Sequence, residues 1–387
     1  MPAVPEFEFN APPRTIFRAG AAQELAAAFT GFGCVSRVLV VTDKGVRGLG
    51  LLDAPLAGLR AAGLSVEIFD DVVADPPEAV VLAAADAARA SGAEAVIGFG
   101  GGSPMDAAKL AAILAAGDQP LSEMYGVGKV TGGRLPLVAV PTTAGTGSEA
   151  TPVAVVTTGE TTKMGVSSPK LIPDVAVLDP DLTLGLPAHI TAATGVDAMV
   201  HAIEAYASAV KKNPVSDAMA VEALRLLSGS LLKACADGSD KDARGAMLLG
   251  ASLAGQAFAN APVAAVHALA YPLGGIFHIP HGLSNALMLE PVLRFNASVA
   301  APLYGELEAA LDPRAEGDAH TLSDRFIARM GALCDEAGVQ RRLRDVGVSH
   351  NDLPRLAEDA MLQTRLLGNN PRPVTQADAQ ALYEEAW

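Results

Sequence analysis

The stretch Ala93-Glu-Ala-Val-Ile-Gly-Phe-Gly-Gly-Gly-Ser-Pro-Met-Asp106 decides the fold class. An apolar run typical of a buried strand leads into a glycine-rich turn, and Pro104 stands where a helix would begin. Because glycine lacks a Cβ atom, the backbone at 100–102 can approach a bulky anion, which the free N–H groups of the helix would bind. The turn is therefore a candidate pyrophosphate site. The pattern Gly-x-Gly-x-x-Gly is incomplete because Ser103 takes the third position, so a plain strand-to-helix turn is the alternative.

Strand-like and helical stretches alternate on both sides of this unit. Apolar runs at 37–41, 65–69 and 137–140 predict further strands, and a short one is expected within 174–181. Alanine-rich stretches at 76–90 and 104–115 predict the intervening helices. The resulting β-α-β series predicts a parallel sheet with helices on its faces.

The pattern of predicted secondary structure changes beyond Pro187. Strand-like runs stop, and long stretches rich in alanine and leucine follow at 191–208, 216–236 and 242–259. We therefore expect an α/β domain over residues 1–186 and an all-helical domain over residues 187–387. Residues 245–277 contain no charged side chain and are long enough to cross a bilayer. Polar residues and Pro262 interrupt them, which favours two buried helices of a soluble domain.

Composition and charge exclude several classes of protein. The formal charge is −15 and the isoelectric point about 4.9, so we expect neither nucleic acid nor a membrane surface as a partner. The 3 cysteines are far apart in the sequence and form no Cys-x-x-Cys pair, which indicates neither a disulfide framework nor a thiolate metal site. The acidic, proline-containing start does not resemble a signal peptide. These features predict a cytoplasmic protein.

A second polar cluster follows the predicted strand at 137–140. Its sequence is Pro141-Thr-Thr-Ala-Gly-Thr-Gly-Ser-Glu149, and ligands of an open α/β sheet bind at the carboxyl ends of strands. Asp43 also ends a strand, where its carboxylate could accept both hydroxyls of an adenosine ribose and repel a 2′-phosphate. We therefore expect NAD as the cofactor, with NADP as the alternative. Asp43 as a helix N-cap is the other interpretation.

Four residues of the second half suit a metal ion. Asp197 and His201 are four residues apart in a helical stretch, so both project from one face. His267 and His281 are 14 residues apart, an interval that can bring histidines of two helices to a common point. Three imidazoles and one carboxylate suit Fe²⁺, Zn²⁺ or another divalent ion and leave a position for a substrate oxygen. Taken singly, a histidine is more often structural or exposed than a ligand, and Asp197 could be an ordinary capping or surface acid.

The motifs as a set resemble a known family. They span nearly the whole chain and comprise Gly100-Gly-Gly-Ser-Pro-Met-Asp106, Pro141-Thr-Thr-Ala-Gly-Thr146, Ala193-Thr-Gly-Val-Asp-Ala-Met-Val-His-Ala-Ile-Glu-Ala-Tyr206, His267-Ala-Leu-Ala-Tyr-Pro-Leu-Gly274, Ile279-Pro-His-Gly282 and Gly368-Asn-Asn-Pro-Arg372. The chain thereby resembles the iron-containing (group III) alcohol dehydrogenases, in particular the lactaldehyde reductase and 1,3-propanediol dehydrogenase branch.

The resemblance implies a fold, a site and an assembly. It implies a dinucleotide-binding α/β domain and a helical metal-binding domain, the architecture also found in dehydroquinate synthase, with the cofactor in a cleft between them and usually a homodimer or larger assembly. It places the metal on Asp197, His201, His267 and His281, and the substrate pocket at Phe258. It assigns the cofactor to Asp43, Gly100, Gly101, Gly102, Ser103, Asp106, Thr142, Thr143, Thr146 and Lys163.

One departure from the family concerns catalysis. Many relatives read His-Pro-Leu-Gly where this chain has Tyr271-Pro-Leu-Gly, so a proton relay through that histidine is lost. His278, three residues before His281, could take over part of the role. The Tyr271 phenol could donate a hydrogen bond, but a phenol is not a base near neutral pH without a large pKa shift. We count His267, His281, His278 and Tyr271 as the candidate catalytic residues.

The predicted reaction is reversible hydride transfer between a primary alcohol or its aldehyde and nicotinamide, with a divalent ion as Lewis acid. Three alternatives stay open. A maleylacetate reductase would act on a keto acid without the metal. A dehydroquinate synthase-like lyase needs several basic residues for a phosphorylated substrate, whereas the chain near the proposed ligands is nearly uncharged. A nucleotide-binding protein without catalysis is the third.

Overall fold

The computed structural model describes residues 6–159 and 162–387, which form two compact units. One unit is Asn10–Gly185. The other is Leu186–Trp387 with the described residues that precede Asn10. An α/β unit is followed by a helical one, so the predicted fold class is confirmed.

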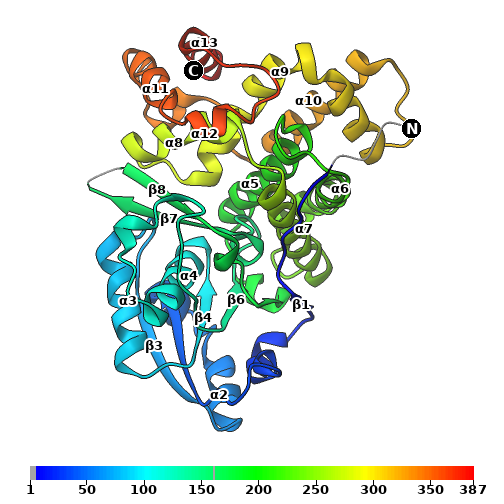
Figure 1. The fold of residues 1–387 in the computed structure, drawn as a ribbon. Coiled ribbons are helices and arrows are strands. Elements are labelled where there is room, and N and C mark those ends of the chain that lie inside the picture. Colours follow the sequence, from blue (N-terminus) through cyan, green and yellow to red (C-terminus); the bar gives the residue numbers. More distant parts are fainter. Residues whose placement is uncertain (1–5, 160–161) are drawn as a thin grey trace. The chain divides into compact units, whose positions relative to one another are not determined.

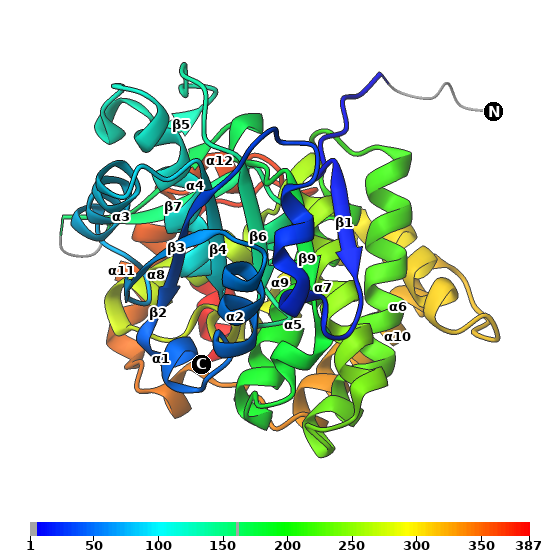
Figure 2. The same cartoon turned by 90° about the horizontal axis from the view of Figure 1, so that it is seen from below.

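A six-stranded sheet of order β1-β9-β6-β4-β2-β3 forms the centre of the α/β unit, and every pair of neighbours is parallel. Its strands are β1 (Arg14–Phe17), β2 (Arg37–Asp43), β3 (Ser65–Val72), β4 (Ala95–Gly100), β6 (Leu137–Pro141) and β9 (Val175–Leu178). Figure 2 shows β1 at an edge of this sheet, beside β9. All but β1 match strands predicted from apolar runs.

Alternating side chains of the strands build two separate cores, because successive residues of a strand point to opposite faces. In β2, Leu39 and Val41 belong to the core formed with α3 (Glu78–Ala90) and α4 (Gly102–Ala116). Val38 and Val40 belong to the other, formed with the 3₁₀ segment Ala21–Phe29, α1 (Lys44–Gly48) and α2 (Asp53–Ala61). Helices therefore cover both faces of the sheet, as a parallel sheet requires.

A smaller sheet of order β5-β8-β7 adjoins α4, which contacts β7. It consists of β5 (Gly126–Val127), β7 (Val153–Thr158) and β8 (Thr162–Ser167), with β7 and β8 antiparallel. None of these strands was predicted from the sequence. Nor was β1, which has only four residues, three of them exposed.

Helices make up the second unit, whose described residues form no strand beyond Leu186, as the sequence predicted. The helices are α5 (Ala188–Ala207), α6 (Pro214–Ala236), α7 (Lys241–Asn260), α8 (Ala265–Phe277), α9 (His281–Leu311), α10 (Ala319–Glu336), α11 (Leu353–Ala360), α12 (Thr364–Leu367) and α13 (Gln376–Ala386). Figure 1 shows α5 beside α6 and α7, and α5 also contacts α9. The central position of α5 explains why it is buried along most of its length.

The uncharged stretch 245–277 folds as two helices, with the break near Pro262 that the sequence predicted. α7 ends at Asn260 and α8 begins at Ala265. Among the described residues, no helix combines the length and apolar character that a membrane crossing requires.

Candidate metal centre and cofactor turn

The central helix α5 carries the first half of the candidate metal centre. Asp197 and His201 lie one turn apart on it and are 2% and 4% exposed. A 3.6-residue helical period places residues four apart on the same face, so the spacing read from the sequence puts both side chains on one side of α5.

Histidines at the beginnings of the next two helices complete the cluster. His267 lies in the first turn of α8, and His281 is the first residue of α9. One ligand atom from each of Asp197, His201, His267 and His281 lies within 4.8 Å of the other three. The rings of His201 and His267 are stacked, with centroids 4.7 Å apart. The four residues that spacing and resemblance single out are thus brought to one point.

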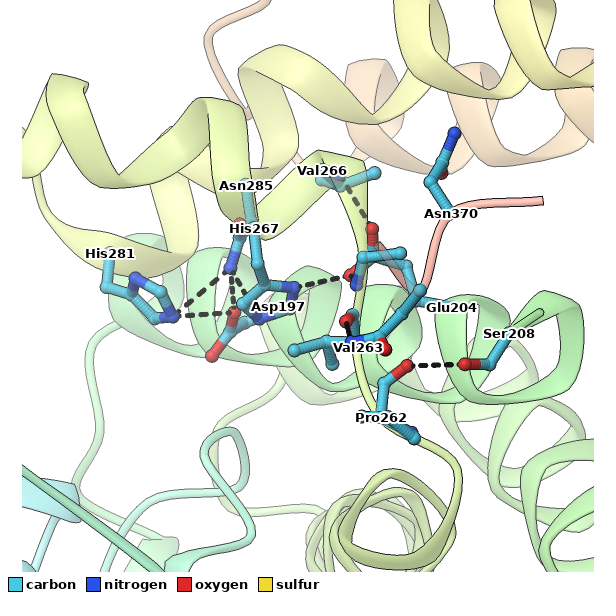
Figure 3. A network of polar contacts seen from close by, with 12 residues as sticks. Asp197, Glu204, Ser208, Pro262, Val263, Val266, His267, His281, Asn285 and Asn370 are labelled. Carbon is cyan, nitrogen blue, oxygen red and sulfur yellow. Dashed lines mark hydrogen bonds and ion pairs between the residues drawn. The ribbon is translucent and has the colours of Figure 1, made fainter. Parts of the chain in front are cut away.

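The contacts of Asn285 show that the cluster suits a cation. One turn after His281 on α9, the Asn285 Nδ2 donates to Asp197 Oδ1 at 2.6 Å, and lies 3.2 Å from His267 Nε2 and 3.3 Å from His281 Nε2. A carboxylate oxygen and two imidazole nitrogens thus surround one N–H donor, and carboxylate and imidazole are also the ligand types that a divalent ion takes. Figure 3 shows these contacts. Asn285 was not predicted from the sequence, although its four-residue spacing from His281 places both on one face of α9.

The electrostatics of the cluster favour a charged carboxylate. Burial by itself would raise the pKa of Asp197. The imidazoles of His201, His281 and His267 and the hydrogen bond from Asn285 outweigh burial, so the pKa of Asp197 lies below its ordinary value. An ionised carboxylate is the form that a divalent cation requires.

Glu204 is a further residue of this region that was not predicted from the sequence. It lies on α5, and its Oε2 is 2.6 Å from His267 Nδ1. Its position two turns after Asp197 on the same helix was the available signal, because residues seven apart share a face.

The remaining candidate residues of the helical unit differ in how close they lie to the four clustered residues. The Phe258 ring stacks on His201 at 4.4 Å between centroids, and the Tyr271 ring lies 6.0 Å from that of His281. His278 is exposed, ends α8 in a left-handed conformation (φ 55°) and is not among the four clustered residues.

The glycine-rich turn of the α/β unit has the geometry of an anion cradle. Gly100 has φ +149°, and a Cβ atom there would lie 2.8 Å from Pro104 Cγ. A Cβ on Gly102 would lie 3.0 Å from Thr146 Cγ2, and one on Gly101 would lie 3.7 Å from Thr143 Oγ1. α4 begins at Gly102 with no side-chain cap on its N–H groups. Free N–H groups beside a turn without side chains fit a pyrophosphate.

Neighbouring candidates lie against this turn. The Thr142 N–H donates to the Gly100 carbonyl at 2.9 Å, which joins the polar cluster at 141–149 to the glycine turn. Asp43 is the N-cap of α1, since its Oδ1 accepts from the Val46 N–H at 2.8 Å. Its Oδ2 lies toward Gly100, 3.5 Å from where a Cβ would be. Asp43 therefore has the capping role considered as its alternative, and still borders the turn.

Two predicted cofactor residues have their observed partners within the protein. Asp106 accepts hydrogen bonds from Ser148 Oγ at 2.6 Å and the Val155 N–H at 2.9 Å, and burial raises its pKa. These hydrogen bonds of Asp106 connect α4 to Ser148 of the polar cluster and to β7. Lys163 Nζ forms an ion pair of 2.8 Å with Asp75.

Comparison with known proteins follows the same two-part division. The model of the iron-containing alcohol dehydrogenases matches residues 12–180, and that of the C-terminal part of the Fe-containing alcohol dehydrogenase family matches residues 191–387. Long-chain-alcohol dehydrogenase 1 of Geobacillus thermodenitrificans is 42% identical over 97% of this chain and 95% of its own. The 1,3-propanediol dehydrogenase of Citrobacter freundii is 38% identical over 91% of each chain.

Solved structures agree with these matches. A crystal structure of 1,3-propanediol oxidoreductase superposes with a TM-score of 0.95 at 36% identity, over 99% of this chain and 100% of that one. Sulfoacetaldehyde reductase from Bifidobacterium kashiwanohense, solved in complex with NAD⁺, superposes with a TM-score of 0.88 at 29% identity over 99% of each chain.

Together with these matches, the parallel-sheet α/β unit and the helical unit identify an oxidoreductase, and the aspartate–histidine cluster is its candidate metal site. The chain belongs to the iron-containing alcohol dehydrogenase family and is an alcohol dehydrogenase and aldehyde reductase. The expected resemblance is thereby confirmed.

Proposed function

We propose that this enzyme interconverts small primary alcohols and their aldehydes by reversible hydride transfer to and from nicotinamide, and that it requires a divalent metal ion. The cluster of Asp197, His201, His267 and His281, with ligand atoms within 4.8 Å of one another, is the observation that carries the proposal. One carboxylate and three imidazoles suit Fe²⁺, and Zn²⁺ would fit the same donors.

The residues around the centre have distinct proposed roles. A divalent ion held there supplies Lewis acidity that stabilises negative charge developing on a substrate oxygen. Phe258, stacked on His201, would form an apolar wall beside the reacting carbon. Tyr271, whose ring lies 6.0 Å from that of His281, would donate a hydrogen bond where relatives have a histidine. His278 is exposed at the end of α8 and is the weaker candidate for proton transfer.

NAD is the proposed cofactor, with NADP as the alternative. The glycine turn at 100–102, Ser103, Thr142, Thr143 and Thr146 would hold the pyrophosphate, and Lys163 would contact the dinucleotide. Asp43 supports NAD because a carboxylate beside the turn would repel a 2′-phosphate. The NAD⁺ complex of the related sulfoacetaldehyde reductase agrees with this preference. Asp106, hydrogen-bonded to Ser148 and Val155, would position the turn and not touch the cofactor.

The test is metal analysis of the purified enzyme together with NADH and NADPH oxidation over a panel of short aldehydes, hydroxyaldehydes and a dicarboxylic keto acid. We expect about one divalent ion per chain and faster turnover of aldehydes with NADH. Turnover of the keto acid alone, in protein without metal, would establish the maleylacetate reductase alternative. Bound cofactor and metal without any aldehyde turnover would instead indicate a binding protein.

We propose further that the enzyme is cytoplasmic and assembles as a homodimer or larger homo-oligomer. The family resemblance supports the assembly, and the acidic charge supports the absence of nucleic-acid and membrane partners. Light scattering coupled to size-exclusion chromatography measures the oligomer mass. A mass of one chain at micromolar concentration would contradict the proposed assembly.

A further inference from the structure

Glu204 is a buried carboxylate next to the metal centre that belongs to no ligand set. It is 5% exposed and lies on α5, three residues after His201. Its two oxygens receive three contacts, all from α8 or the residue before it. Figure 3 shows Glu204 on the side of His267 that faces away from Asp197.

Two of these contacts cap helix α8. The N-cap residue Ala264 has no side-chain oxygen, and no side chain of α8 caps its start. Glu204 Oε2 instead accepts from the Ala264 N–H at 3.0 Å, and Oε1 accepts from the Val266 N–H at 2.6 Å. A carboxylate from α5 thereby satisfies N–H groups that otherwise lack partners at a helix start, where negative charge is also favoured by the helix dipole.

The third contact determines which nitrogen of His267 faces the metal centre. Glu204 Oε2 lies 2.6 Å from His267 Nδ1. An ionised carboxylate only accepts hydrogen bonds, so Nδ1 must carry the hydrogen. The Nε2 lone pair is then directed at the cluster, where metal binding needs it.

We propose that Glu204 is a positioning residue of the metal centre, which holds His267 in the Nδ1–H tautomer and fixes the helix start that carries it. The inference rests on the proposed metal dependence. It makes metal affinity depend on a residue that does not touch the ion. Removing such a partner of a metal-bound histidine typically weakens metal affinity about 10–100-fold.

The isosteric substitution Glu204→Gln tests this directly. Glutamine supplies one oxygen and an NH₂ group, so at least one of the three N–H donors would face another donor. Zn²⁺ affinity of the metal-free protein is measured by competition with a chromophoric chelator for wild type, Glu204→Gln and Glu204→Ala. We expect about one tight site per chain in wild type and Kd values raised about 10–100-fold in both variants.

Glu308→Gln is the matched control. Glu308 is also buried in the helical unit (2% exposed), but it pairs with Arg329 on α10, at 2.6 and 2.9 Å, and not with a metal ligand. Its Zn²⁺ affinity should stay within threefold of wild type. Equal affinity of wild type and both Glu204 variants would overturn the inference. A wild type without a Zn²⁺ site would overturn the proposed metal dependence itself, and the inference with it.

A second measurement does not depend on whether a Glu204 variant folds. The ¹⁵N shifts of the imidazole nitrogens in histidine-labelled wild type distinguish the two tautomers, and the His267 signals are identified by their absence from His267→Gln. We expect Nδ1–H and unprotonated Nε2 in the metal-free protein. The opposite tautomer would overturn the role of Glu204 even if Glu204→Gln failed to fold.

Discussion

Asp197 is the single carboxylate of the four-residue cluster, and its negative charge is buried. Asp197 is 2% exposed, and a buried carboxylate without compensation costs several kcal/mol. Its carboxylate accepts a hydrogen bond from the Asn285 amide at 2.6 Å, and its Oδ1 lies 3.7 Å from His281 Nε2. A divalent cation held by the same residues would place further positive charge beside this carboxylate. The buried charge of Asp197 therefore supports a bound metal ion, and its carboxylate would be one of the ligands.

Replacing one imidazole removes a ligand without burying a new charge. We expect His267→Ala to abolish turnover while the far-ultraviolet circular dichroism spectrum stays unchanged. The measurement is NADH oxidation with the best aldehyde of the panel. His189→Ala, an exposed histidine at the start of the same helix as Asp197, is the control and should keep wild-type activity. A well-folded His267→Ala enzyme with the wild-type rate would show that His267 is not part of the site.

Tyr271→Phe separates hydrogen bonding from acid–base catalysis. A hydrogen bond contributes about 0.5–1.5 kcal/mol, so kcat/KM should fall less than about tenfold. General acid–base catalysis contributes about 10²–10⁴-fold. Steady-state kinetics near neutral pH measure the difference. A loss above about 100-fold would show that Tyr271 transfers a proton and has taken over the role of the relatives' histidine.

At the scale of elements, the centre depends on the close approach of α9 to α5. Gly282, next to His281, has no Cβ, and one added there would lie 2.4 Å from the Ala193 carbonyl oxygen and 3.4 Å from Asp197 Cβ. The backbone of α5 cannot rotate away as a side chain could. The two helices that carry Asp197 and His281 are thus held at a distance that only glycine permits.

We predict that Gly282→Ala moves the start of α9 and lowers metal affinity at least tenfold, because His281 no longer reaches the other ligands. The chelator competition assay measures this. Gly229→Ala on α6 is the control: nothing lies within 4 Å of its added Cβ. In an exposed helix interior this change should leave metal binding intact and stabilise the protein by about 0.5–1 kcal/mol. Unchanged affinity in Gly282→Ala would contradict the packing argument.

The strand-to-helix turn after β4 allows a corresponding test of the cofactor site. Gly100→Ala introduces strain at φ +149° and a contact of 2.8 Å with Pro104 Cγ, so the turn must deform. We expect NADH affinity, measured by fluorescence titration, to fall at least tenfold while metal content stays the same. Gly133→Ala, where an added Cβ meets nothing within 4 Å, should leave both unchanged. Normal NADH binding by Gly100→Ala would place the pyrophosphate elsewhere.

At the scale of the whole molecule, the candidate cofactor residues and the candidate metal ligands lie in different units. The candidate cofactor residues all lie within Asn10–Gly185, and the four candidate metal ligands all lie within Leu186–Trp387. A bound metal stabilises only the state that binds it, by about 4.1 kcal/mol at 1,000 times its Kd. Its removal should therefore act first on the unit that contains the ligands.

We predict that chelation raises amide hydrogen exchange in α5, at the start of α8 and at the start of α9, and leaves the six-stranded sheet unchanged. Hydrogen-exchange mass spectrometry of metal-loaded and chelated protein measures this, and reloading with metal should restore protection. Increased exchange confined to the sheet would contradict the placement of the metal in the helical unit.

Much of the fold was predictable because local pattern and burial agree. The apolar runs of β2, β4 and β6 identified buried parallel strands, and the loss of such runs after Pro187 identified the helical part. β7 was missed although residues 153–156 form an apolar run, and β8 was missed because it buries only Val166 and contains Lys163 and Gly165. Their strand conformation comes from pairing with each other, which is a tertiary effect.

The sequence by itself determined the chemical types and the short-range spacing. A helical period places Asp197 beside His201, and three adjacent glycines leave a backbone open to an anion. Only the tertiary structure decided which distant groups contact each other. Glu204 contacts His267, Asn285 contacts Asp197, and Asp106 accepts a hydrogen bond from β7. The contacts of Glu204 with His267, Asn285 with Asp197 and Asp106 with Val155 join residues 49–88 positions apart. Such pairs follow from the packing of elements that are distant in the sequence, so the helical period that puts Glu204 on the face of Asp197 does not reveal its contact with His267.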